Sequence, residues 1–131
     1  MKATQITVFL ENTKGRLAEL TEILYRNNVQ IVALSIAETA DYGVVRMVVN
    51  DTELAQRVLQ DASYLTKVGE VICLTVKNQP GALHGILKTL QEHHINVSYM
   101  YTYSTTDKAN LLIKTSDIDQ TLMLFPVAGD A

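Results

Sequence analysis

Two stretches of the sequence share one pattern: Asn12-Thr13-Lys14-Gly15-Arg16-Leu17 and Asn78-Gln79-Pro80-Gly81-Ala82-Leu83. They lie 66 residues apart, and at this offset the chain aligns with itself without gaps. Over residues 6–59 the identical pairs are Ile6/Ile72, Asn12/Asn78, Gly15/Gly81, Leu17/Leu83, Leu24/Leu90, Thr39/Thr105, Asp41/Asp107 and Asp51/Asp117. Because fixed-period self-similarity indicates a structural repeat, the sequence predicts two copies of one unit. A unit this small is marginally stable alone, so we expect the copies to pack on each other, on a second chain, or on both.

Hydrophobic spacing predicts the order strand, helix, strand, strand, helix, strand in each copy. The first copy reads as strand 6–10, helix 17–24, strands 29–39 and 44–49 around a turn at 41–43, a helix capped by Asn50 or Asp51, and strand 64–68. The second reads as strand 71–76, helix 83–90, strands 95–104 and 109–115, and a helix capped by Ser116 or Asp117 that runs to about residue 125. Residues 126–131 are too few for a final strand, so the second copy is expected to lack it or to borrow one from a partner.

This order predicts an α+β fold of two tandem ferredoxin-like βαββαβ sandwiches, with antiparallel sheets and helices on one face. The predicted domains are residues 1–69 and 70–131, the second with its final strand short or missing.

Composition narrows the possible classes of protein. Of 131 residues, 47% are hydrophobic and 19% charged, with a net charge of −3, which argues against disorder and against phosphate-driven nucleic-acid binding. The most apolar stretch, 44–49, contains Arg46 and is far shorter than the roughly 20 residues of a membrane span. The N-terminus shows no signal-peptide core, and a single cysteine forms no internal disulfide. We therefore expect a cytoplasmic protein that binds neither membrane nor nucleic acid.

Each of the two matching turns leads from a strand to a helix N-terminus. Free backbone amides and the helix dipole favour a small anion such as a carboxylate there. Glycine allows a ligand to approach the backbone, and asparagine offers both a donor and an acceptor, which suits an amino acid. The alternative is a plain turn in which asparagine caps the helix and glycine serves the geometry.

The pattern Asn-x-Pro-Gly-x-Leu at the second of these turns, followed by Ile95-Asn96-Val97, resembles the ACT domain family. Over residues 4 to about 125 the chain resembles stand-alone proteins made of two tandem ACT domains. The resemblance implies a regulatory module, not an enzyme, that binds a free amino acid between paired domains without a cofactor or metal. The ligand would contact the first turn of one domain and the second strand of its neighbour. Carried over by position, the ligand-binding residues are Asn78, Pro80, Gly81, Ala82, Leu83 and Asn96 in the second copy, and Asn12, Gly15, Arg16, Leu17 and Gln30 in the first.

The first copy departs from the family pattern. Lys14 replaces the proline, and Gln30 stands where the second copy has Asn96. Lys14 and Arg16 either strengthen carboxylate binding or form solvated surface, and the second interpretation is favoured. The two turns could therefore bind unequally. The expected assembly is a homodimer of four domains, because dimerisation would cover an open sheet edge. A regulated protein partner is expected to recognise the ligand-bound arrangement.

Other residues allow further hypotheses. Tyr99, Tyr101 and Tyr103 occupy alternate positions of one strand and so share a sheet face. Their side chains could line a pocket, contact another subunit, or form a half-buried strand surface. Cys73 lies in a strand and is interpreted as packing. The three histidines, His84, His93 and His94, are not arranged for metal binding, and the adjacent pair is expected at a helix end.

Three alternative functions remain open. An acylphosphatase-like hydrolase on the same sandwich would use Arg16 to hold phosphate, but the second copy has Ala82 there. An RNA-binding sandwich would use the three tyrosines but lacks a basic cluster. A protein–protein interaction module would need no ligand.

Overall fold

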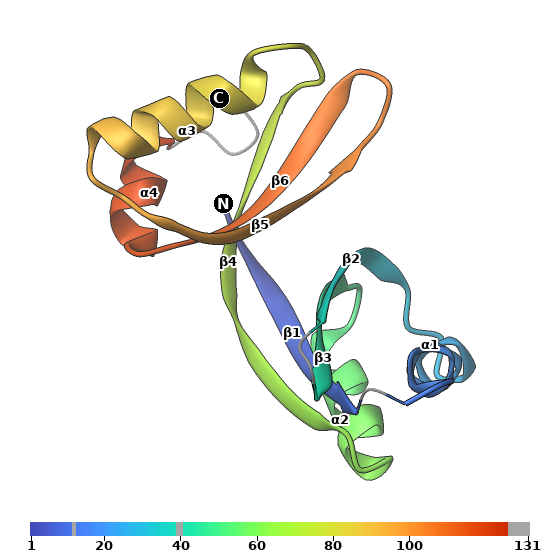
Figure 1. Ribbon diagram of the computed structural model, residues 1–131. Coiled ribbons are helices and arrows are strands. Elements are labelled where there is room, and N and C mark those ends of the chain that lie inside the picture. The colour runs from blue at the N-terminus through green and yellow to red at the C-terminus, as the bar shows by residue number, and fades with distance from the viewer. Residues whose placement is uncertain (12, 39–40, 126–131) are drawn as a thin grey trace. The chain divides into compact units, whose positions relative to one another are not determined.

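The structure is a computed structural model that describes residues 1–11, 13–38 and 41–125 (Figure 1). The chain divides into two compact units. The N-terminal unit is Thr4–Glu70, and the C-terminal unit combines Met1–Ala3 with Val71–Ala131.

The described part of the chain contains six strands and four helices. They are β1 (Lys2–Glu11), α1 (Arg16–Arg26), β2 (Ile31–Glu38), β3 (Tyr42–Val49), α2 (Thr52–Asp61), β4 (Leu65–Lys77), α3 (Ala82–Glu92), β5 (Val97–Ser104), β6 (Lys108–Thr115) and α4 (Ile118–Leu124). The strand order of the antiparallel sheet is β2-β3-β1-β4-β6-β5, so β2 and β5 are the outermost strands. The predicted α+β, ferredoxin-like fold is confirmed.

The core of the N-terminal unit lies between its helices and one face of its strands. Alternate residues of β1 and β3 are buried together with the inward faces of α1 and α2. This core comprises Ile6, Val8, Leu10, Leu20, Leu24, Val29, Val45, Met47, Val49, Ala55, Leu59 and Tyr64. Because both helices pack on the same set of alternate strand residues, they cover one face of these strands.

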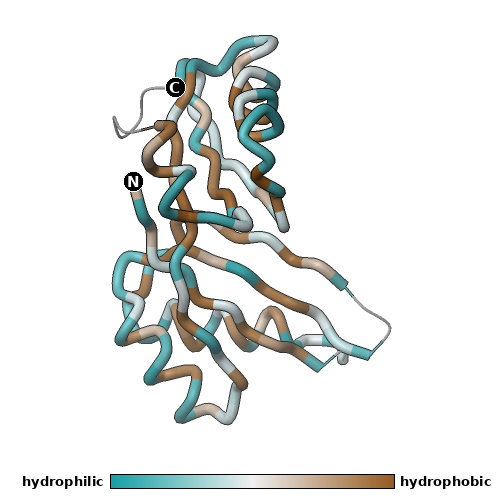
Figure 2. The backbone as a smooth tube through the Cα atoms, turned by 90° about the vertical axis from the view of Figure 1, so that its left-hand side faces the viewer, coloured by the Kyte–Doolittle hydropathy of each residue, from teal (hydrophilic) through white to brown (hydrophobic). Residues whose placement is uncertain are grey.

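The C-terminal unit repeats this arrangement with α3 and α4. In Figure 2 brown and teal segments alternate along its helix α3, as expected for a helix with one buried face. Its core comprises Ile72, Leu74, Val76, Ile86, Leu90, Ile95, Leu111, Ile113 and Phe125. The stripe predicted over 83–90 therefore faces the core.

The second helix of each copy begins at an aspartate. The side chain of Asp51 accepts a hydrogen bond from the Leu54 amide at 3.1 Å, and that of Asp117 accepts one from the Gln120 amide at 3.0 Å. Such a cap satisfies an amide that has no partner within the helix. Of the two caps that the sequence allowed in each copy, the aspartate is the one used.

Several predicted element boundaries were wrong. The strands expected at 64–68 and 71–76 form the single strand β4, because Gly69 and Glu70 stay extended and make no turn. The strands expected to begin at 29 and 95 begin at Ile31 and Val97. The preceding residues close the helix ends, since the Val29 amide bonds to the Leu24 carbonyl and that of Ile95 to the Leu90 carbonyl. In the turn expected at 41–43, the last two residues belong to β3.

The edge of the C-terminal unit beside β4 is occupied by the start of the chain. Met1 and Cys73 exchange two backbone hydrogen bonds: the Cys73 amide donates to the Met1 carbonyl at 2.8 Å, and the Met1 amino group donates to the Cys73 carbonyl at 3.2 Å. This exchange is typical of an antiparallel pair. Residues 126–131, where the sequence left room for a short strand, lie outside the described residues.

Candidate functional site

The first turn of each copy ends at a glycine with left-handed backbone geometry. Gly15 and Gly81 both have φ of 88°, and α1 and α3 begin at the next residue. Apart from the glycine itself, its chain neighbours and its own helix backbone, no atom of the described residues lies within 4 Å of the position that a Cβ would take at either glycine. Glycine is therefore needed for the backbone angle and leaves open space above the helix start.

Backbone amides are free at these helix starts. In the C-terminal unit, the Ala82 amide bonds to the Gln79 carbonyl at 3.3 Å and the Gly85 amide to the Gly81 carbonyl at 3.0 Å. The amides of Gly81, Leu83 and His84 donate to no other described residue. In the N-terminal unit the same holds at the corresponding positions 15, 17 and 18. Unpartnered donors at the positive end of a helix dipole attract a carboxylate.

Asn78 holds the turn of the C-terminal unit to the loop between β5 and β6. Its backbone amide donates to the Asp107 carbonyl at 2.9 Å, and its side-chain Nδ2 donates to the Thr105 carbonyl at 3.0 Å. The proposal that asparagine caps the helix is therefore wrong for Asn78, since no side chain caps α3. The Oδ1 atom of Asn78 accepts no hydrogen bond from a described residue. Asn12, the corresponding residue, lies outside the described residues.

The second-strand residues Gln30 and Asn96 occupy equivalent positions just before β2 and β5. The Gln30 amide donates to Asn50 Oδ1 at 2.9 Å, and the Asn96 amide donates to Ser116 Oγ at 3.0 Å. Asn50 and Ser116, the alternative helix caps in the sequence, thus anchor these strand starts instead. The two side chains differ in their hydrogen bonds. Gln30 Nε2 donates to the Ile31 carbonyl at 3.1 Å, whereas the side-chain amide of Asn96 bonds to no described residue. Asn96 is therefore the freer of the two.

Each of these residues lines a cavity between the end of a helix and the start of a strand. The cavities measure about 490 Å³ in the N-terminal unit and about 540 Å³ in the C-terminal unit. Seven lining positions correspond at the 66-residue offset, and the sequence singled out only one of the seven in each copy, Gln30 or Asn96, as ligand-binding. The first cavity is lined by Thr21, Leu24, Tyr25, Asn28, Val29, Gln30, Ile31 and Asn50, and the second by Leu87, Leu90, Gln91, His94, Ile95, Asn96 and Val97.

The two halves of the candidate site lie at opposite ends of one helix within each unit. Gly81 precedes α3 and Asn96 follows it, and a helix of 11 residues is roughly 16 Å long. A single amino acid is too short to contact both. The turn of one unit and the second strand of another must therefore combine if both are to bind one ligand.

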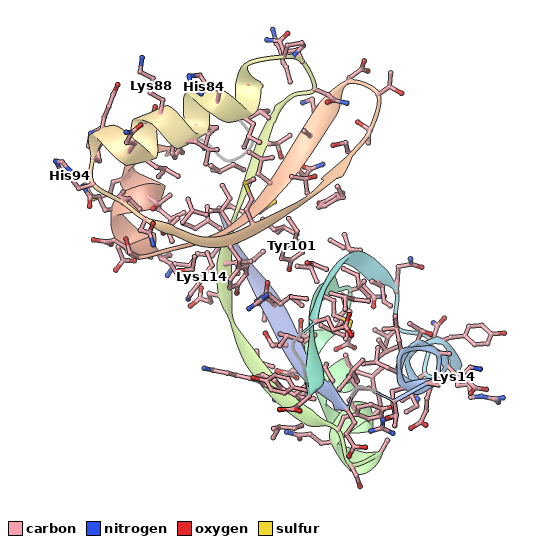
Figure 3. The ribbon with its side chains drawn as sticks, in the orientation of Figure 1. Lys14, His84, Lys88, His94, Tyr101 and Lys114 are labelled. Atoms are coloured by element: carbon pink, nitrogen blue, oxygen red, sulfur yellow. The ribbon has the colours of Figure 1, made fainter. Side chains whose placement is uncertain are left out.

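Arg16 points toward the turn between α2 and β4. Its Nη1 donates to Glu19 Oε1 at 3.0 Å, and its guanidinium carbon lies 4.5 Å from the centre of the Tyr64 ring. The Tyr64 hydroxyl donates to the same Glu19 oxygen at 2.8 Å, and a crevice of about 260 Å³ adjoins the cluster. The half-buried Arg16 was expected to be solvated surface, and this was wrong because it stacks on a buried ring. Lys14 lies on the surface at the start of α1 (Figure 3).

Because of this cluster, we expect the free energy of unfolding to fall as the pH rises through the alkaline range. Burial, and then the hydrogen bond to Glu19, raise the pKa of Tyr64 from 10.0 to about 12, against the opposing charge of Arg16. A raised folded-state pKa favours the neutral phenol, so this stabilisation is fully present below pH 10 and is lost as the pH rises through about 12. We expect urea unfolding to show a steeper loss of stability between pH 10 and 12 in the wild type than in Tyr64→Phe. Tyr25→Phe, at a ring that is 78% exposed, is the control and should match the wild type. Equal slopes for Tyr64→Phe and the wild type would contradict the assignment.

The other singled-out residues have structural surroundings. Tyr99, Tyr101 and Tyr103 face β6 residues Lys114, Leu112 and Asn110, so they share a sheet face as predicted. Tyr101 and Lys114 lie on the side of β5 and β6 away from α3 (Figure 3). Burial raises the pKa of the half-buried Cys73 thiol, consistent with packing.

The histidines lie on α3 and at its end. His93 ends the helix with Nδ1 2.9 Å from the Thr89 carbonyl, and His94 follows with φ of 58°. Among the described residues, no group of three or more His, Cys, Asp or Glu is placed to hold a metal ion. None of the helices described is both long enough and apolar enough to cross a membrane.

Comparisons with known proteins agree with this architecture. Residues 1–125 match the model of the ACT domain pair family. The crystal structure of a protein from Bacteroides thetaiotaomicron is similar with a TM-score of 0.92 and 36% identity, covering 96% of this chain and 88% of that one. The ligand-free regulatory subunit of aspartate kinase from Thermus thermophilus has a TM-score of 0.66 and 9% identity over 92% of this chain and 87% of that one, which shows a shared fold. No curated protein matches the sequence. The chain belongs to the ACT domain pair family.

Proposed function

We propose that this chain is a regulatory protein that senses a free amino acid and has no catalytic activity of its own. The observation that carries the proposal is the set of free amides at the Gly81 turn, together with the unbonded side chain of Asn96. Solved structures of similar fold include regulatory subunits of aspartate kinase from two Thermus species, which supports a regulatory role.

The chemistry of an amino acid fits the two half-sites. The ligand carboxylate would accept hydrogen bonds from the amides of Gly81 and Leu83, with Ala82 placed between them. The ligand ammonium would donate to the Asn96 Oδ1 of a neighbouring unit, and the side chain would enter the cavity beside it. A second copy of the chain would supply the neighbour, which makes the proposed assembly a homodimer. Ligand would favour one arrangement of the units over another, and a regulated protein would bind preferentially to one of these arrangements.

The C-terminal unit is the better binding site of the two. The side chain of its Asn96 bonds to no described residue, whereas the side chain of Gln30 in the N-terminal unit already donates to the Ile31 carbonyl. Pro80 fixes the backbone of its turn, while the N-terminal turn has Lys14 there. We therefore propose that Asn78, Pro80, Gly81, Ala82, Leu83 and Asn96 form the principal site, and that Asn12, Gly15, Arg16, Leu17 and Gln30 form a weaker one.

A thermal-shift screen against the twenty amino acids tests the proposal. A ligand at 100 times its dissociation constant adds about 2.7 kcal/mol of stability, which raises the melting temperature of a chain this size by roughly 10 °C. We expect one amino acid, or a small group of related ones, to produce this shift, and Asn96→Ala to reduce it. A screen in which no amino acid changes the melting temperature would refute the sensor.

The same screen and a hydrolysis assay with an acyl phosphate separate the alternative functions. A module that only binds proteins would show no shift with any amino acid. An acylphosphatase would hydrolyse an acyl phosphate, and its Arg16 would have to leave Glu19 and Tyr64 to hold phosphate. The existing contacts of Arg16 therefore favour the sensor over the hydrolase.

A further inference from the structure

The cavities of the two units share one backbone frame but differ in chemistry. The apolar residues at their base are kept at the 66-residue offset, as the pairs Leu24/Leu90 and Val29/Ile95 show. Three other lining positions change in chemical type, and these are Thr21/Leu87, Tyr25/Gln91 and Asn28/His94. At the last of them the neutral amide of the first cavity is replaced by an imidazole, the side chain that ordinarily gains a positive charge between pH 8 and 5. The two cavities therefore suit different ligand side chains.

His94 is the one residue able to carry a charge among the described residues that line the C-terminal cavity. The rest of the lining consists of apolar side chains and two amides, namely Leu87, Leu90, Ile95, Val97, Gln91 and Asn96. No aspartate or glutamate belongs to this described lining, so nothing in it would neutralise an imidazolium. A charge placed among apolar groups and amides attracts an opposite charge more strongly than it would in bulk water. The lining is therefore suited to a ligand that brings its own negative charge.

The imidazole of His94 has no structural partner in the described part of the chain. Its ring bonds to no described residue, whereas Nδ1 of the adjacent His93 lies 2.9 Å from the Thr89 carbonyl. The backbone of His94 has a left-handed φ of 58°, the same value as Asn28 in the first copy. Glycine or asparagine usually occupies this position after a helix, so the helix end itself does not require a histidine. The ring is therefore available to a ligand in the cavity.

The end of α3 favours a cation at His94 and leaves few bare carbonyls to repel an anion. The negative end of a helix dipole stabilises a protonated histidine. The carbonyl of Leu90 accepts a hydrogen bond from the Ile95 amide at 2.9 Å. The carbonyl of Gln91 accepts one from the His94 amide at 3.0 Å. Glu92, the nearest acidic residue in the sequence, is exposed and lines no part of the cavity. The local field is therefore compatible with an anionic group beside the His94 ring.

We propose that the C-terminal cavity selects an amino acid with an acidic side chain, aspartate or glutamate, through pairing of the side-chain carboxylate with His94. This inference rests on the proposed function, in which the α-carboxylate binds the Gly81 turn and the ammonium binds Asn96. The side chain of the ligand then crosses the apolar base of the cavity toward the imidazole, and the amide of Gln91 offers a second donor. A hydrogen bond between two charged groups is roughly twice as strong as one between neutral groups. The cavity therefore favours aspartate over asparagine and glutamate over glutamine.

Isothermal calorimetry with these two acid and amide pairs tests the preference, at roughly pH 6, where imidazole ordinarily carries charge. Each pair differs only in the side-chain group, and we expect the wild type to bind the preferred acid about tenfold more tightly than its amide. His94→Asn gives the cavity the residue of Asn28, which adopts the same φ, and should bring this ratio close to one while amide binding is kept. His84→Asn is the matched control. It removes the same ring from the side of α3 that faces away from the sheet, and should leave the ratio unchanged (Figure 3).

The outcomes separate the acidic preference from the sensor itself. Circular dichroism establishes that both variants are folded, as expected for substitutions at exposed positions. A wild type that binds a neutral or basic amino acid but neither acid overturns the preference and leaves the sensor standing. A preference for acids that persists in His94→Asn, or that His84→Asn abolishes equally, overturns the role of His94. A wild type that no amino acid stabilises, in the thermal-shift screen described above, refutes the sensor and the preference together.

Discussion

The variant Gly81→Val is expected to lose the entire ligand-induced stabilisation, about 2.7 kcal/mol at 100 times the dissociation constant. The reason is the backbone angle of Gly81, whose φ of 88° is disfavoured for a β-branched residue by roughly 1–2 kcal/mol. A valine that keeps this angle fills the open space over the helix start, where the ligand carboxylate would lie. A valine that changes the angle turns the free amides away. Either response removes the anion site while the core of the unit stays intact.

Two matched variants make this result specific. Gly15→Val makes the same change at the same φ in the N-terminal unit and should keep most of the ligand response if the C-terminal unit is the principal site. Gly85→Ala lies one turn into α3, where a Cβ meets no atom within 4 Å, and should stabilise the chain by about 0.5–1 kcal/mol. Isothermal calorimetry with the amino acid found in the screen measures all three variants. Unchanged affinity in Gly81→Val would exclude the turn as the binding site.

The repeat explains why so much of the fold could be predicted from the sequence. Alternation in β1 and helical spacing in α1 are local patterns, and their recurrence after 66 residues fixes the element order twice. Local chemistry also limited the cap of each second helix to two neighbouring residues, of which the structure uses Asp51 and Asp117. The pairing of Met1 with Cys73 could not be predicted in this way, because it joins residues far apart in sequence that share no local signal. The unbroken course of β4 was missed because Gly69 resembles a turn residue.

The candidate site was predicted by position but not by its contacts. The sequence identified Gly81 and Asn96, and the structure adds that the first precedes free amides and that the second has an unbonded side chain. It could not show that Asn78 bonds to the Thr105 carbonyl, since the hairpin loop that carries that atom is distant in the chain. Nor could it show that Arg16 stacks on Tyr64, because the second copy has no counterpart of that pair.

The matched core variants Leu24→Ala and Leu90→Ala are each expected to cost about 2–5 kcal/mol of stability. Both leucines are 1% exposed and occupy the same place in the repeat, on α1 and on α3. Each belongs to the core of its own unit, and the two described cores share no residue. We therefore propose that the predicted domains 1–69 and 70–131 respond separately, so that each cavity loosens mainly the unit that contains it.

Hydrogen exchange followed by mass spectrometry measures this separation directly. Leu24→Ala should lower protection in peptides from Thr4–Glu70 and leave α3 and β6 close to the wild type, and Leu90→Ala should do the reverse. Peptides from β4 are the most informative, because its first residues belong to one unit and its last residues to the other. If protection falls equally in both units for either variant, the continuous strand β4 couples them into one cooperative structure. A sensor of that kind would transmit ligand binding through the stability of the whole chain, whereas separate units would confine the effect of ligand to the unit that binds it.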